Sequence, residues 1–459
     1  MEHYIFYCKL SLLAVLSLIT ACCMLSRRWY VNLVAFLACL SGETFLAHLF
    51  FPGYMLCPAA ASFIILFLSR IWDLSRTPAK GNGADPIRLP VRSGIRESRL
   101  EFYYHYSNFL VYGGAGSGKT KSIGKWLLSE YMRLGFAGFI YDFKDTDYTR
   151  TAYNLIKRHR YPHKFYYVSF DRPERSYRFN PLKVVRDRTE LIQLMEDVLL
   201  ALLPKKEQQN EWVAGGLGIL RGVAFRFWDE FPEHCTLPHI LAFIMTASAR
   251  QLSLFLQQNL VSEMLAGAYL KAEGSEKTQA SYLSTLCNNL ATVSQNEEIA
   301  YVLSGDDFDF NLIDPETPKL FAVSNNFSKN SVYAPVISML MTISARQFSM
   351  QNRVPFVYFL DEMTTVNIKN FETLPSVLRE YKAAFILLTQ SGAKLENLYG
   401  KLDRSSVEAN FGNMFLGRTK DVEALKYYPL FFGKEEKERR SRSSGKSGAS
   451  SSSSVTVSS

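Results

Sequence analysis

The chain has 459 residues, a formal net charge of +9 and a charged fraction of 21%. This length allows two or three domains of about 150 residues each. The mildly basic charge is compatible with nucleic acid or with an anionic membrane surface and does not choose between them. The 7 cysteines form no C-x-x-C pair and no cysteine–histidine cluster with zinc spacing, which argues against a structural zinc site and favours a reduced, cytosolic domain.

Residues 1–74 have the composition of a membrane anchor. Three apolar runs, at 4–25, 29–50 and 55–72, approach the length of about 20 residues that a transmembrane helix needs. Basic residues between the first two runs and after the third favour three spans with both basic clusters in the cytoplasm. Two spans would require one run to lie in the membrane interface or to pack within the membrane without crossing it. We therefore expect a membrane anchor with the rest of the chain in the cytoplasm.

A phosphate-binding motif follows a proline- and glycine-rich segment, residues 75–100, that we expect to be a linker. A strand candidate, Asn108–Tyr112, leads into the run GGAGSGKT, which matches the P-loop pattern G-x-x-x-x-G-K-[ST]. A helical pattern follows at 121–132, so backbone N–H groups would converge on one phosphate. The candidate phosphate-binding residues are Gly113, Gly114, Ala115, Gly116, Ser117, Gly118, Lys119 and Thr120.

The residue types in this motif predict binding and hydrolysis of a nucleoside triphosphate. Glycines let the backbone approach a phosphate without a Cβ clash. Lys119 is expected to reach the β- and γ-phosphates, and the Thr120 hydroxyl is expected to hold Mg²⁺.

The remaining pattern predicts an α/β fold with a parallel sheet, because strand and helix patterns alternate. The α/β pattern occupies 101–184 and 306–433, and an uninterrupted series of helical patterns at 185–305 predicts an inserted all-α domain. The charged and serine-rich residues 434–459 are expected to be disordered. The expected strands after the P-loop lie at 137–142, 164–170, 319–324, 355–360, 383–389 and 413–417.

Asp361 and Glu362 directly follow an unbroken apolar strand pattern, as in a Walker B motif. Because the carboxyl ends of parallel strands meet at one edge of a sheet, this pair is expected beside the P-loop. Asp361 would then hold the Mg²⁺ shell and Glu362 would polarise the attacking water. An acidic pair at a strand end is common by itself; the P-loop upstream favours the catalytic interpretation.

Three further candidates lie at strand ends or near them. Gln390 ends the next buried strand and is expected to orient water or sense the γ-phosphate, unless it is a solvated strand terminus. The turn Asp142–Asp145 would shape the nucleotide site or a subunit contact, or would be only a salt-bridged turn. Arg379 is a candidate arginine finger acting across a subunit interface, with an ordinary surface residue as the alternative.

These motifs together resemble the type IV secretion coupling proteins, the TraG/TraD-like conjugative DNA pumps, from about residue 100 to 430. The resemblance rests on Gly113–Thr120, Asp142-Phe-Lys144, Phe179-Asn-Pro-Leu182, Phe359-Leu-Asp-Glu362, Arg379-Glu-Tyr381, and Gln390 followed by Leu395–Gly400. It implies a RecA-like P-loop NTPase domain with an inserted all-α domain and an N-terminal transmembrane anchor. It also implies an ATP- and Mg²⁺-dependent homohexamer that binds single-stranded DNA, a relaxase complex and components of the type IV secretion channel.

Two departures and several alternatives qualify this resemblance. The family pattern Asp-x-Lys-Gly-Glu is replaced by Asp142-Phe-Lys-Asp-Thr146, and a serine-rich end stands where the family continues into a further segment. A coupling protein for protein effectors only and a chromosomal DNA translocase remain alternatives. An ABC-type transporter ATPase lacks support because its Leu-Ser-Gly-Gly-Gln signature is missing, and intact Lys119, Asp361 and Glu362 argue against a scaffold without hydrolysis.

Overall fold

The structure is a computed structural model that describes residues 85–93, 96–144, 146–203, 208, 210–429, 439–447 and 450–458, and the isolated positions 5, 9, 45 and 49. Its contacts divide the chain into two units, Met1–Ala84 and Asp85–Ser459. In the part of the chain that is described, no helix is both long enough and apolar enough to cross a bilayer. The three spans expected within residues 1–74 fall outside the described residues, apart from the four isolated positions.

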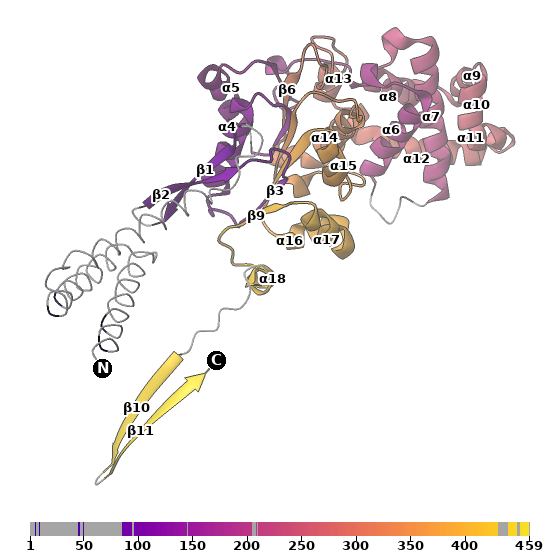
Figure 1. Ribbon diagram of the computed structural model, residues 1–459. Coiled ribbons are helices and arrows are strands. Elements are labelled where there is room, and N and C mark those ends of the chain that lie inside the picture. Colours follow the sequence, from indigo (N-terminus) through magenta and orange to yellow (C-terminus); the bar gives the residue numbers. More distant parts are fainter. Residues whose placement is uncertain are drawn as a thin grey trace. The chain divides into compact units, whose positions relative to one another are not determined.

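A seven-stranded parallel sheet forms the core of the second unit, in the order β5-β6-β4-β7-β8-β3-β9. Figure 1 labels β3, β6 and β9 of this sheet. This sheet confirms the parallel α/β architecture expected from the alternating pattern. The strands are β3 (Phe109–Tyr112), β4 (Ala137–Asp142), β5 (Lys164–Ser169), β6 (Lys319–Ser324), β7 (Phe356–Asp361), β8 (Ala383–Thr389) and β9 (Asn413–Leu416).

The five inner strands of the sheet are buried on both faces, which explains why they are apolar without alternation, whereas the edge strands β5 and β9 are partly exposed. Alternate residues of each strand point to opposite faces. On β7, Val357 and Phe359 face the helices α4 (Lys125–Arg133) and α5 (Asp147–His159), whereas Tyr358 and Leu360 face the larger core that includes α14 (Asn330–Arg346).

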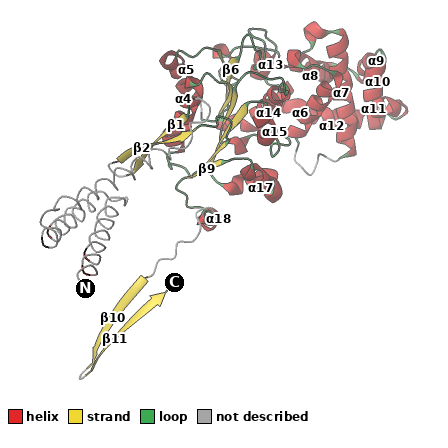
Figure 2. Cartoon of the chain, in the orientation of Figure 1, coloured by secondary structure: helices red, strands yellow, loops and turns green. Residues whose placement is uncertain are grey.

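Among the described residues, eight α-helices lie between β5 and β6 and form the helical part of the unit (Figure 2). Helix α7 is central and contacts α6 and α8 to α12. Glycine permits this close packing: a Cβ on Gly222 would lie 2.9 Å from the Ser262 carbonyl oxygen. These helices are α6 (Arg188–Ala201), α7 (Glu211–Glu230), α8 (Leu237–Thr246), α9 (Ala249–Gln257), α10 (Leu260–Leu265), α11 (Gly267–Lys271), α12 (Glu276–Ser294) and α13 (Glu297–Leu303).

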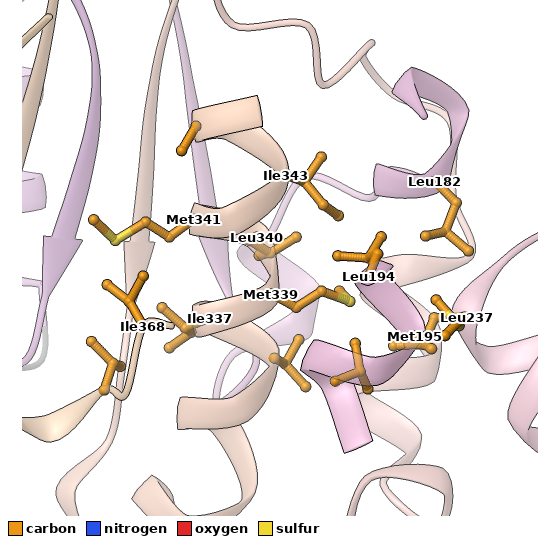
Figure 3. Packing of buried hydrophobic residues seen from close by; sticks show 14 of the residues in the cluster. Leu182, Leu194, Met195, Leu237, Ile337, Met339, Leu340, Met341, Ile343 and Ile368 are labelled. Carbon is orange, nitrogen blue, oxygen red and sulfur yellow. The ribbon is translucent and has the colours of Figure 1, made fainter. Parts of the chain in front are cut away.

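Helices α6 and α14 connect the helical part to the sheet through one continuous core. Leu194 of α6 lies beside Met339, Leu340 and Ile343 of α14 (Figure 3). All four side chains are almost completely buried. The remaining helices, α15 (Leu374–Glu380), α16 (Gly392–Tyr399), α17 (Lys401–Ala409) and α18 (Val422–Tyr427), lie between or after the last strands.

The structure differs from two sequence-based expectations. The segment expected to be a linker contains most of an antiparallel hairpin, β1 (Ile87–Ser93) and β2 (Arg96–Phe102), because Ile87 and Leu89 alternate with polar residues and pack against α4. The tail expected to be disordered contains a second antiparallel hairpin, β10 (Arg439–Ser447) and β11 (Ser450–Ser458).

Candidate nucleotide-binding site

The carboxyl ends of three neighbouring strands bring the candidate residues to one place. The sheet order is β7-β8-β3, so β8, which Gln390 directly follows, lies between the P-loop strand β3 and the strand β7 that ends in Asp361. Parallel strands end at the same edge of a sheet. The loop after β3, the acidic pair after β7 and the amide after β8 therefore share one edge.

The P-loop is anchored to the strands on both sides of β3. The Gly113 N–H donates to the Thr389 carbonyl oxygen at 3.2 Å, and the Gly114 N–H donates to the Arg418 carbonyl oxygen at 3.0 Å. Gly116 and Gly118 have φ angles of 72° and 88°, a region that favours glycine. A loop fixed at its start and turned by two left-handed glycines can present its N–H groups to an anion.

Lys119 lies at the start of a π-helical turn, Lys119–Gly124, that continues into α4. Its Nζ donates to the Gly113 carbonyl oxygen at 2.6 Å and to Glu362 Oε1 at 3.3 Å. Burial lowers the pKa of Lys119, and the Glu362 carboxylate partly opposes this effect. The ammonium is thus buried, held beside the loop and close to an acidic partner.

Three polar side chains surround one carboxylate oxygen of Glu362. Its Oε1 accepts from Lys119, lies 3.8 Å from Lys144 Nζ and accepts from Gln390 Nε2 at 3.4 Å. The residue is 2% exposed and its φ of 47° is unusual for a residue with a side chain. Such backbone strain is characteristic of sites where the side-chain direction matters. Its Oε2 is buried and has no hydrogen-bond partner among the described residues.

Asp361 is fully buried beside this cluster, and neither of its carboxylate oxygens has a hydrogen-bond partner in the described part of the chain. Burial raises the pKa of Asp361 to about 7, an effect that Lys144 and Lys119 reduce and that Glu362 and Asp142 increase. A buried carboxylate without a partner is costly unless a cation or a proton compensates it.

The oxygen atoms at this edge suit Mg²⁺. Magnesium at phosphate sites binds one or two protein oxygens and keeps its other positions for phosphate and water. Asp361 supplies a carboxylate, and the half-buried Thr120 supplies a hydroxyl on the first turn after the P-loop. The unpaired state of the Asp361 oxygens is the observation that supports a cation there.

Two residues of this cluster were not selected as site residues from the sequence. Lys144 belongs to the turn after β4, which the sequence suggested could shape the nucleotide site. The contact between its Nζ and Glu362 is seen only in the folded chain. Thr389 immediately precedes Gln390, and its hydroxyl is buried with no partner among the described residues. Asp142 has a structural role: it accepts from the N–H and the hydroxyl of Thr149 at 2.8 and 2.9 Å and so holds the start of α5.

Arg379 is the one candidate that the fold does not bring to this cluster. It is exposed in the last turn of α15, just before β8 begins. Gln390 follows the carboxyl end of the same strand. At about 3.3 Å per residue, the seven-residue strand separates the two by roughly 20 Å.

Comparisons with known proteins identify the family of the chain and solved structures with a similar fold. The family model described as the type IV secretion-system coupling protein DNA-binding domain matches residues 100–459. The fold is similar to the bacterial conjugative coupling protein TrwBdeltaN70 in its trigonal form in complex with sulphate, with a TM-score of 0.58, 16% identity and 82% of each chain covered.

TrwB has also been solved with nucleotides. The complex with the non-hydrolysable ATP analogue ADPNP gives a TM-score of 0.55 at 16% identity, covering 73% of this chain and 81% of that chain. The complex with ADP and Mg²⁺ gives 0.54 at 16% identity, covering 72% and 79%. No curated protein sequence matches the chain significantly. At 16% identity, the similarity to these structures supports a shared fold and no more than that.

Proposed function

Because the chain belongs to the type IV secretion-system coupling protein family, we propose that it is an ATPase that couples a relaxase–DNA complex to a type IV secretion channel and drives DNA translocation. The observation that carries the enzymatic part is the buried cluster of Lys119, Asp361 and Glu362 at the carboxyl ends of β3 and β7, which lie on either side of β8. The DNA-binding description of the family supports the DNA part of the proposal.

ATP is the proposed substrate, and Mg²⁺ the proposed metal. TrwB, which has the same fold, was solved with an ATP analogue and with ADP and Mg²⁺. The P-loop amides and the Lys119 ammonium would bind the phosphates, while Asp361 and Thr120 would hold the metal. Bound Mg²⁺ would neutralise charge that develops on the phosphate oxygens.

Glu362 is the proposed acceptor of the proton from the attacking water. Its Oε2 is the free oxygen of the carboxylate in the described structure, whereas Oε1 is held by Lys119 and Gln390. A fixed carboxylate with one available oxygen can orient a water and take its proton. Gln390 would keep this carboxylate in position and contact the same water or the γ-phosphate.

The assembly proposed for this activity is a membrane-anchored homohexamer. Arg379 is far from the cluster in its own chain, so it would complete the site of a neighbouring subunit as an arginine finger. The apolar N-terminal residues would anchor the ring in the bacterial inner membrane, with the ATPase domain in the cytoplasm.

The test of this function combines hydrolysis with DNA transfer. Lys119→Ala should abolish ATP hydrolysis and DNA transfer between cells while leaving membrane insertion unchanged, and normal transfer by this variant would contradict the pump proposal. The ATPase rate should rise when single-stranded DNA is added to the full chain. Hydrolysis that DNA does not stimulate would favour a coupling protein for protein effectors only.

A further inference from the structure

A cavity of about 710 Å³ lies away from the nucleotide cluster, between α5 and the segment that follows β5. Pockets of roughly 300–1,000 Å³ are the usual size for small-molecule ligands. Its walls contain three arginines, Arg150, Arg172 and Arg175, and no aspartate or glutamate. The cavity therefore offers positive charge to an anion, although the exposed carboxylate of Glu174 lies 3.9 Å from Arg175 Nε and offsets part of it.

Aromatic rings line the same cavity. Tyr153 on α5 and Tyr177 after β5 are 62% and 44% exposed, which is high for large rings. Tyr153 lies against Phe165 with 6.5 Å between ring centroids, so it is supported from one side. Exposed rings beside arginines are the combination that binds the bases and phosphates of single strands.

We propose that this cavity is a binding site for single-stranded nucleic acid. Tyr153 and Tyr177 supply stacking surfaces for unpaired bases, and Arg150 and Arg175 contact phosphates. A duplex hides its base faces and cannot use the rings in this way. An acidic peptide would use the arginines but would leave the aromatic surfaces without a function, so the combination favours nucleic acid.

The cavity is linked to the nucleotide cluster by a short series of contacts. Thr149 lines the cavity and donates two hydrogen bonds to Asp142. The Lys144 N–H donates to the same carboxylate at 3.3 Å, and Lys144 Nζ lies 3.8 Å from Glu362. Occupancy of the cavity can therefore bias the position of Lys144. This coupling rests on the proposed ATPase function, whereas the binding itself does not.

Binding is tested directly with the full chain and a fluorescein-labelled twelve-residue oligodeoxythymidylate, by fluorescence anisotropy at several salt concentrations. The double variant Arg150→Glu/Arg175→Glu should weaken binding at least about tenfold and flatten the salt dependence by about 1.4 in log–log slope, since each lost phosphate contact removes about 0.7. The matched control, Arg250→Glu/Arg353→Glu, makes the same charge change at two exposed arginines outside the cavity. Its effect should stay within about twofold.

Stacking is tested separately from charge. Tyr153→Ala should weaken binding about 5- to 100-fold, and Tyr153→Phe, which keeps the ring, should restore it. The proposal would be overturned if the double variant and Tyr153→Ala both bound the oligonucleotide with the affinity and the salt dependence of the control variant. The proposal would also be overturned if these variants changed the subunit assembly, measured by light scattering, but left oligonucleotide binding unchanged. The cavity would then be filled by a second copy of the chain. None of these measurements requires ATP hydrolysis, so failure of the ATPase proposal is seen independently.

Discussion

The ammonium of Lys119 lies 3.3 Å from Glu362 Oε1, although 243 positions separate the two residues in the chain. Both side chains are buried, so this ion pair fixes the acidic residue beside the P-loop. A phosphate bound in the loop would compete with Glu362 for the same ammonium. Nucleotide binding and the position of the proposed proton acceptor are therefore coupled.

Glu362→Gln tests this coupling. The amide keeps the shape of the side chain but cannot accept a proton and attracts Lys119 less strongly. We expect hydrolysis to fall by about 10²- to 10⁴-fold, the usual contribution of a general base. ATP affinity, measured with a fluorescent ATP analogue, should be unchanged or higher. Weaker ATP binding together with unchanged turnover would contradict the role assigned to Glu362.

Asp361→Asn should stabilise the fold in the presence of EDTA at pH 8. Burial raises the pKa of Asp361 to about 7, so between about pH 4 and 7 the unfolded chain releases a proton that the folded chain retains. Stability therefore falls as the pH rises through this window, by at most about 4 kcal/mol at 1.36 kcal/mol per pKa unit. The variant removes that loss.

The measurement for Asp361→Asn is the thermal unfolding midpoint of both proteins between pH 4 and 8. Their difference should be largest at pH 8 and disappear near pH 4, where both side chains are neutral. The same variant should lose Mg²⁺-dependent ATP hydrolysis. A variant that is less stable than the natural protein at pH 8 would show that the carboxylate is compensated within the fold.

Lys144→Ala should lower the turnover of ATP by about tenfold. This loss is smaller than that expected for a buried donor to the transition state, because Lys144 is half exposed and its Nζ lies 3.8 Å from Glu362. Lys144→Arg, which keeps the charge, should retain most of the activity. Steady-state kinetics should place the effect in kcat rather than in KM. Equal activity of the alanine and arginine variants would remove Lys144 from the site.

Much of the sheet and of the site could be predicted because the signals are local. The P-loop has a fixed spacing, and β6 and β8 have the bounds that their unbroken apolar runs predict. The place of β8 between β3 and β7 could not be predicted from those signals, because strand order depends on contacts between distant segments. That order is what brings Gln390 to Glu362.

The β1–β2 hairpin and the position of Lys144 were missed for related reasons. Proline and glycine near residues 78–90 indicate a linker, and the two buried residues Ile87 and Leu89 are too short a pattern to outweigh them. Pro90 is tolerated because this hairpin has only two strands, and both are edge strands. The Lys144–Glu362 contact joins two strand ends, so it follows only from the assembled sheet.

Asn108→Ala should destabilise the whole fold. The buried amide donates to the carbonyl oxygens of Pro375 and Asn410 at 3.1 and 2.9 Å, and it accepts from the Phe385 N–H at 2.9 Å. Removing it leaves buried backbone groups unpaired, at a cost of about 2–4 kcal/mol. Urea unfolding would measure this loss. Asn288→Ala, at an exposed position of α12, is the control and should change stability by less than about 0.5 kcal/mol.

Arg379→Ala should abolish hydrolysis through the neighbouring subunit, since Arg379 lies at the opposite end of β8 from the cluster in its own chain. An arginine finger contributes about 10³- to 10⁵-fold. Mixing this variant with Lys119→Ala subunits, each inactive alone, should restore part of the ATPase activity, because an intact finger then meets an intact P-loop. The exposed Arg353, just before β7, provides the control substitution to alanine. Mixed assemblies that form, as shown by light scattering, but remain inactive would exclude a role for Arg379 across the interface.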